Sequence, residues 1–226
     1  MRHIILLHGA IGAKDQLEPL AKELKLQGFK VYTFSFSGHG QTSFQTKFNI
    51  EQFALELEQF IKENKLQKPT VFGYSMGGYV ALYLAHQQPS LLGNIITLGT
   101  KFEWSLEISQ KEIKMLDSKT ILEKVPKFAE TLKTRHGNDW ELLLQKTAEM
   151  MIGLGNKNEL SLKDFASIEN KVLIGLADKD TMVTLSETTE IYKQLKNGSM
   201  YMLPNTKHPI ETVNVKLLSQ LISECN

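Results

Sequence analysis

The sequence predicts an α/β fold: a parallel sheet of about six strands with helices on both faces and a small helical cap. Short apolar β-runs alternate with amphipathic helical stretches, which is the pattern of a parallel sheet covered by helices. The β-runs do not alternate cleanly between polar and apolar residues, which indicates strands buried on both faces. One stretch, 101–167, carries only helical pattern, and we interpret it as the cap.

The β-runs predict strands at 3–7, 30–36, 70–74, 94–98, 171–176 and 199–203. Helices are expected at 15–27, 50–64 and 76–87, and a last helix is expected to start near Pro209. Within the cap, the pattern predicts helices at 111–115, 126–136 and 140–152. Asn138 and Glu141 have the spacing of a capping box, with Asn138 as the N-cap of the last cap helix.

Length and composition limit the classes of function. The 226 residues suit one domain, 1–226, with 101–167 inserted as the cap. The net charge is +1, so no basic stripe is available for nucleic acid. Cys225 is the single cysteine, which favours a reducing compartment. The apolar run at 4–7 is too short for a signal peptide or a membrane span, so we expect a cytoplasmic protein without a membrane partner.

The motif Gly73-Tyr74-Ser75-Met76-Gly77 carries the strongest chemical signal. G-x-S-x-G here ends a β-run and opens a helix, and a serine on such a turn is held out of the sheet with its Oγ exposed. No lysine follows the glycines, so a phosphate-binding loop is disfavoured. The motif predicts Ser75 as a nucleophile.

A second glycine-containing turn, His8-Gly9-Ala10-Ile11-Gly12, follows the first β-run. Attack on an ester carbonyl creates an oxyanion, which needs two fixed donors. The backbone N–H groups of Ala10 and Met76 are the expected pair. His8 itself is interpreted as a structural turn residue.

The sequence also offers a base and an acid. His208 follows the last β-run and is the expected general base, because a free serine is a weak nucleophile at neutral pH. Asp178 and Asp180 both follow the fifth β-run, and one carboxylate must orient the histidine. From spacing alone, either aspartate could serve.

These motifs resemble those of the α/β-hydrolase superfamily along nearly the whole chain. The order Ser75…Asp180…His208 is the order that this fold uses. The segment Asp180-Thr181-Met182-Val183 resembles the family's D-x-x-V acid turn, which selects Asp180 over Asp178. The cap lies where the family places it, and the resemblance implies a reduced sheet without the first two strands of the full fold.

The leading prediction is a serine hydrolase that cleaves an ester or thioester of a small, largely apolar substrate through an acyl-enzyme. No metal and no cofactor are expected. Catalytic pockets are mostly apolar, and methionine adapts to varied shapes. The candidates for the pocket wall in the cap are Phe102, Trp104, Met150 and Met151.

Two alternatives stay open. The first is a carbon–carbon bond hydrolase or lyase that uses the same triad. Tyr79 argues against the lyase, because the menaquinone-pathway lyases with a similar G-Y-S-M-G-G motif have an arginine there. The second is a ligand receptor that keeps the triad but turns over slowly.

Overall fold

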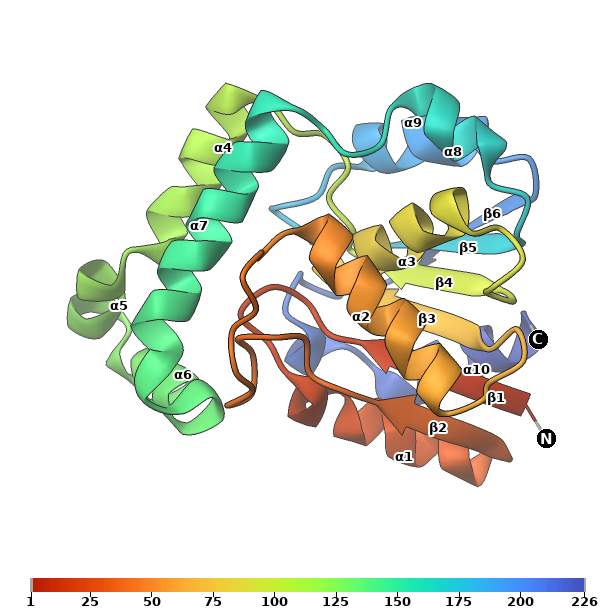
Figure 1. The fold of residues 1–226 in the computed structure, drawn as a ribbon, viewed down its shortest axis with the longest axis horizontal. Helices are drawn as coiled ribbons and strands as arrows, with labels where there is room; N and C mark the ends of the chain where they lie inside the picture. Colours follow the sequence, from red (N-terminus) through yellow and green to blue (C-terminus); the bar gives the residue numbers. More distant parts are fainter. Residues whose placement is uncertain (1, 226) are drawn as a thin grey trace.

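The computed structural model describes residues 2–225 and contains a six-stranded sheet in which every neighbouring pair is parallel (Figure 1). The strands are β1 (Arg2–Leu7), β2 (Phe29–Thr33), β3 (Thr70–Tyr74), β4 (Ile95–Leu98), β5 (Val172–Ala177) and β6 (Gly198–Leu203). Their spatial order is β2-β1-β3-β4-β5-β6. The predicted fold class is therefore confirmed.

Helices cover both faces of the sheet (Figure 1). One face carries α1 (Glu18–Leu26) and α10 (Val215–Glu224), and the other carries α2 (Ile50–Glu63), α3 (Met76–Gln87), α8 (Leu162–Ser167) and α9 (Leu185–Gln194). Successive strand residues point to opposite faces. In β1, Ile4 and Leu6 enter the core under α1 and α10, while Ile5 and Leu7 enter the core under α2 and α3. Both faces of β1 are thus buried, as the uninterrupted apolar run predicts.

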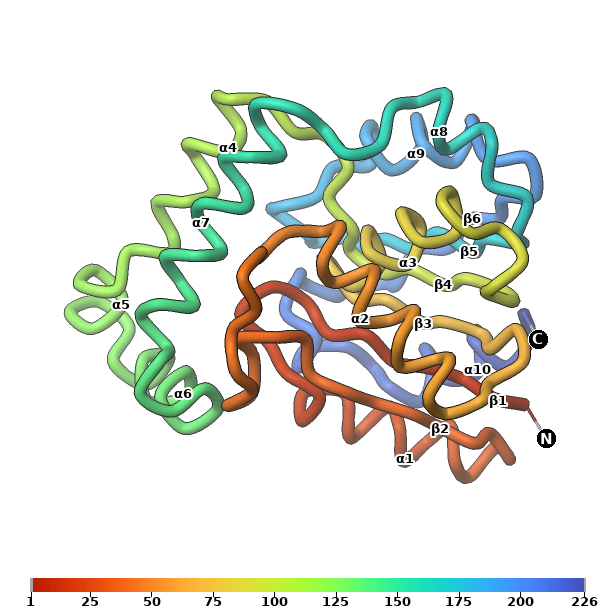
Figure 2. Tube along the Cα trace, viewed as in Figure 1, coloured from red at the N-terminus to blue at the C-terminus, as the bar shows by residue number. Residues whose placement is uncertain are grey.

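The segment between β4 and β5 forms a helical insertion, which we define as α4 to α7. Its helices are α4 (Leu106–Glu112), α5 (Ser118–Lys124), α6 (Pro126–His136) and α7 (Trp140–Asn156). Figure 1 shows the insertion beyond the carboxyl ends of the strands, and Figure 2 shows both chain ends on the opposite side. It has a small apolar core of its own, which includes Leu132, Trp140 and Leu144. The chain between α7 and β5 returns to the sheet as α8, which packs against α3 and α9.

Short 3₁₀ helices join several elements: η1 (Lys14–Leu17), η2 (Ile113–Leu116), η3 (Gly137–Asp139) and η4 (Ile210–Thr212). Within residues 2–225, no helix combines the length and the apolar character that a membrane span requires.

Two helix starts differ from the sequence prediction. Asn138 does not cap α7, because η3 already makes its backbone helical and an N-cap residue needs a non-helical backbone; Asp139 precedes α7, without a side-chain cap. The last helix starts at Val215 rather than near Pro209, because Asn214 caps it by accepting a hydrogen bond from the Leu217 N–H at 3.2 Å.

Candidate active site

Ser75 lies on a strained turn between β3 and α3. Its φ of 51° and ψ of −117° are unusual for a residue with a side chain. A Cβ at Gly73 would lie 2.4 Å from the Gly78 backbone nitrogen, and one at Gly77 would lie 2.6 Å from the Leu7 carbonyl oxygen. The two glycines of G-x-S-x-G are therefore required by close backbone packing, which holds Ser75 at the carboxyl end of β3.

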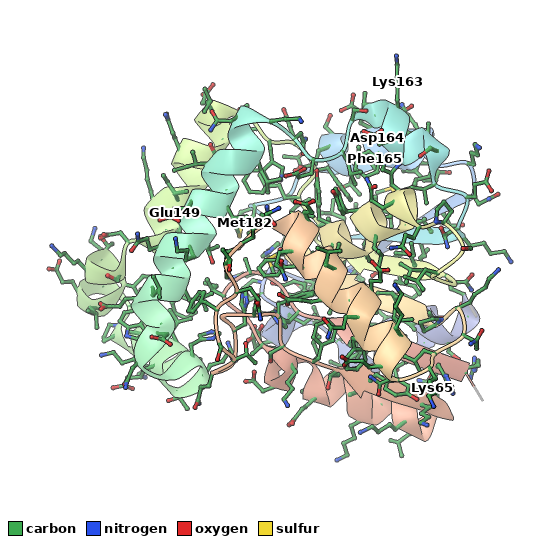
Figure 3. The ribbon with its side chains drawn as sticks, in the orientation of Figure 1. Lys65, Glu149, Lys163, Asp164, Phe165 and Met182 are labelled. Carbon is green, nitrogen blue, oxygen red and sulfur yellow. The ribbon has the colours of Figure 1, made fainter. Side chains whose placement is uncertain are left out.

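Ser75 faces a narrow cavity of about 50 Å³ between the sheet and the helical insertion. The wall is mostly apolar. Figure 3 shows Met182, one of its residues, between α7 and the amino-terminal end of α2. The other residues that line it are Ala10, Ile50, Met76, Tyr79, Lys101, Trp104, Glu112, Met150, Met151, Leu154, Val183 and His208.

Of the four side chains predicted for the pocket wall, Trp104, Met150 and Met151 line the cavity. Phe102 does not, and this prediction is wrong for the structure. Its side chain is 4% exposed and packs edge-on against Phe165 of α8, with ring centres 5.5 Å apart. Phe102 lies four residues after the end of β4, and its side chain turns into the core under α8 instead of toward the cavity.

His208 and Asp180 are joined by a hydrogen bond beside Ser75. The His208 Nδ1 lies 2.7 Å from Asp180 Oδ2, and the Asp180 side chain is 1% exposed. The backbone N–H groups of Met182 and Val183 donate to Asp180 Oδ1 at 2.8 and 3.0 Å. Burial acts to raise the pKa of this carboxyl, but the hydrogen bonds and the charge of His208 outweigh it and hold the pKa below its ordinary value.

An ionised carboxylate can only accept a hydrogen bond, so the Asp180 contact assigns the proton of a neutral His208 to Nδ1. The Nε2 of His208 then carries the lone pair. This nitrogen belongs to the ring that lines the same cavity as Ser75. The arrangement can thus accept a proton from a hydroxyl in the cavity.

Asp178 lies outside this arrangement. Its side chain is exposed, and its Oδ1 accepts a hydrogen bond from the Thr206 N–H at 2.9 Å. Backbone hydrogen bonds from Asn205 and Thr206 lower the pKa of Asp178 below its ordinary value. Asp178 therefore stabilises the turn that leads from β6 to His208, without contacting the histidine ring.

The backbone groups expected to hold an oxyanion lie next to Ser75. Ala10 and Met76 both line the cavity. Met76 is the first residue of α3, and the first N–H groups of a helix have no acceptor within it. Residues 8–12 form the loop after β1, which we call the Ala10 loop. His8 holds this loop in place: its Nδ1–H donates to the Gly9 carbonyl at 2.8 Å, and its Nε2 accepts from the Phe36 N–H at 3.1 Å. His8 is thus a structural turn residue.

His136 also holds the Ala10 loop in place. The sequence predicted it only as the last residue of a cap helix. His136 ends α6, and its Nε2–H donates to the Ile11 carbonyl oxygen at 2.9 Å. Its Nδ1 accepts from the Gly40 N–H at 3.0 Å. Ile11, next to Ala10, has a φ of 50°, which is strained for a β-branched residue. The insertion therefore holds the loop in this conformation.

Lys101 and Glu112 are two charged residues of the cavity wall that the sequence did not single out. Their spacing carries no motif, and they meet only in the folded chain, where the segment after β4 leads into α4. Within residues 2–225, no three His, Cys, Asp or Glu side chains are grouped so that they could hold a metal ion.

The chain is similar to known proteins with this architecture. Residues 2–144 match the family model described as alpha/beta hydrolase fold. The "Probable alcohol acetyltransferase" of Wickerhamomyces anomalus is 26% identical over 180 residues, which cover 78% of this chain and 47% of that protein. The sn-1-specific diacylglycerol lipase of Danio rerio is 28% identical over 96 residues, which cover 42% of this chain and 30% of that protein.

Among solved structures, the enol-lactonase from Burkholderia xenovorans LB400 has a TM-score of 0.81 at 14% identity, with 99% of this chain and 90% of that chain covered. At this identity the likeness shows the fold alone. The chain spans about half or less of the length of the curated relatives it matches. The family match covers more than half of the chain and agrees with the observed sheet, so the chain belongs to the α/β-hydrolase fold family.

Proposed function

We propose that the protein is a serine hydrolase that cleaves a carboxylic ester or thioester of a small, largely apolar substrate. The observation that carries the proposal is that Ser75 and His208 line one cavity while Asp180 is hydrogen-bonded to His208. Ser75 stands on its strained turn, His208 lines the same cavity, and Asp180 accepts the Nδ1–H of His208 at 2.7 Å. These are the groups that nucleophilic acyl transfer requires.

In the first half of the reaction, the Ser75 Oγ attacks the carbonyl carbon while its proton passes to His208 Nε2. The carbonyl oxygen becomes an oxyanion that accepts hydrogen bonds from the N–H groups of Ala10 and Met76. Asp180 stabilises the positive charge on the imidazole. The tetrahedral intermediate then collapses, and His208 returns the proton to the departing alcohol or thiol, which leaves an acyl group on Ser75.

In the second half, His208 removes a proton from a water molecule, whose oxygen attacks the acyl carbon. A second oxyanion forms and collapses, and the proton passes back to Ser75 as the carboxylic acid leaves. The cavity is small and its wall includes Trp104, Met150 and Met151. These side chains favour short or slender apolar acyl groups.

An alcohol can take the place of water in the second half and give a new ester. The similarity to the "Probable alcohol acetyltransferase" of Wickerhamomyces anomalus favours this second candidate. Both candidates share the acyl group on Ser75 and differ only in what removes it.

A fluorophosphonate probe tests the proposal, because it reacts covalently with an activated serine. We expect the probe to label the wild-type protein but not Ser75→Ala, and p-nitrophenyl esters from acetate to octanoate to be hydrolysed only by the wild type. Adding ethanol and measuring ethyl ester against free acid separates transfer from hydrolysis. Equal labelling of the two proteins would place the nucleophile elsewhere, and ligand binding with neither labelling nor turnover would favour the receptor.

A further inference from the structure

The wall of the mostly apolar cavity contains a polar cluster of Lys101, Trp104 and Glu112, backed by Glu187 of α9. Lys101 and Trp104 lie on the segment that follows β4, and Glu112 is the last residue of α4. The cluster therefore stands where the helical insertion joins the sheet. The proposed catalytic chemistry does not use it.

Lys101 connects the members of the cluster. Its Nζ donates to the Met182 carbonyl oxygen at 2.8 Å and lies 3.9 Å from both Glu112 Oε1 and Glu187 Oε1. The same Nζ lies 5.9 Å from the centre of the Trp104 ring. Glu112 and Trp104 are thus held around one ammonium group.

The two carboxylates of the cluster are not equivalent. Glu187 Oε2 accepts from the backbone N–H groups of Phe102 and Glu103, and its Oε1 accepts from that of Thr184. Both carboxylate oxygens of Glu187 are therefore hydrogen-bonded, and they join the segment after β4 to the start of α9. Glu112 is 5% exposed, and its Oε2 is buried without a hydrogen-bond partner within the described residues.

Trp104 supplies the complementary group. Its Nε1–H is buried and also lacks a partner within the described residues. Buried polar groups in folded proteins are nearly always paired, because an unpaired one forfeits its hydration without compensation. Here one unpaired acceptor and one unpaired donor belong to two residues of the cavity wall.

We propose that this cluster is a specificity subsite for a hydroxyl group of the substrate, apart from the ester bond. A hydroxyl is both a donor and an acceptor, so it can pair with an acceptor such as Glu112 Oε2 or with a donor such as Trp104 Nε1–H. A carboxylate at this place would be repelled by Glu112, and the ammonium group that Glu112 faces is already supplied by Lys101. The inference rests on the proposed hydrolase function and narrows its substrates to hydroxylated esters.

Matched pairs of esters test the subsite, each pair differing by a hydroxyl in place of a methyl group. One arm compares p-nitrophenyl ω-hydroxyhexanoate with the heptanoate and varies the chain length around it. The other arm compares monoesters of linear diols with alkyl esters of equal length. We expect kcat/KM to favour the hydroxylated member by at least about tenfold in one arm, because the methyl leaves two buried groups unpaired.

Two variants remove the unpaired groups singly. Trp104→Phe keeps an aromatic ring but removes the donor. In Glu112→Gln the amide oxygen stays toward Lys101, so the NH₂ replaces the free acceptor. Both variants should bring the ratio of kcat/KM for the hydroxylated ester to kcat/KM for its methyl partner toward one. Met151→Leu, which changes only an apolar part of the wall, should retain the wild-type ratio.

Because the readout is a ratio of two substrates on one protein, a general loss of activity does not mimic the result. Equal hydrolysis of both members in both arms would overturn the subsite and leave the hydrolase proposal standing. Preference for ω-amino or ω-carboxy analogues over the hydroxyl would also overturn it. Absence of both Ser75 labelling and ester turnover would reject the hydrolase proposal and the subsite together.

Discussion

Lowering the pH from about 7.5 to about 5 should destabilise the fold through three buried histidines under the Ala10 loop. His8 and His39 are fully buried and His136 is 3% exposed, with ring centres 4.9 Å apart for His8 and His39 and 6.2 Å for His39 and His136. Burial lowers the pKa of all three below the ordinary value. The unfolded chain therefore takes up protons that the folded protein does not.

The size of the effect can be worked out for His8. Burial, partly opposed by its hydrogen bond to Gly9, lowers the pKa of His8 from 6.5 to about 4. These two values predict a loss of about 2 kcal/mol in the free energy of unfolding between about pH 7.5 and about pH 5. The contribution is complete above pH 6.5 and is lost as the pH falls toward the pKa of the folded state, about 4. His39 and His136 shift in the same direction, so the total loss should be larger.

Urea unfolding at the two pH values, followed by circular dichroism, measures this loss. In His8→Gln, the new side-chain oxygen can still accept from the Phe36 N–H, but no ring titrates. The variant should therefore lose about 2 kcal/mol less than the wild type between the two pH values. His3→Gln, at a partly exposed position of β1, serves as the matched His-to-Gln control. Equal losses for wild type and His8→Gln would refute the reasoning.

Three further outcomes can be checked. Asp180→Asn should lower kcat by up to about 10⁴-fold, because an amide favours the wrong histidine tautomer, and a larger loss for Asp178→Asn would contradict the assignment. Gly99→Ala places a Cβ 3.3 Å from Asp180 Oδ2 at a φ of 60°, so kcat should fall, and a wild-type kcat would argue against this crowding. Ser75→Gly should exceed Ser75→Ala in unfolding free energy by about 1 kcal/mol, since glycine relieves the turn; equal urea midpoints would mean that the turn is unstrained.

Much of the sheet could be predicted from the sequence, because each strand is a short apolar run and strands of a parallel sheet follow one another with helices between them. The prediction extended the second strand to residue 36, whereas β2 ends at Thr33. Phe36 lies beyond the end of the strand, and its apolar side chain is buried against His8 and Phe53 instead of within the sheet. The helix α9 was missed, although Thr184 and Glu187 form its capping box.

The candidate site was predictable to the extent that its residues follow strand ends. Ser75, Asp180 and His208 come after β3, β5 and β6, and the carboxyl ends of parallel strands meet at one edge of the sheet. The contacts of Glu112 and His136 were not predictable, because they depend on how the insertion packs onto the sheet. The error at Phe102 has the same origin, since α8 gives its ring a partner in the core.

The insertion does more than close the cavity, because it is joined to the reacting region at two separate points. At one end, Glu112 of α4 pairs with Lys101, which itself donates to the acid turn at Met182. At the other end, His136 of α6 donates a hydrogen bond to the carbonyl oxygen of Ile11, the residue with a positive φ next to Ala10. Movement of α4 would therefore disturb the surroundings of Asp180, and movement of α6 would disturb the loop that contains Ala10. The insertion and the edge of the sheet that carries Ser75 are thus linked through hydrogen bonds and ion pairs as well as through the cavity wall.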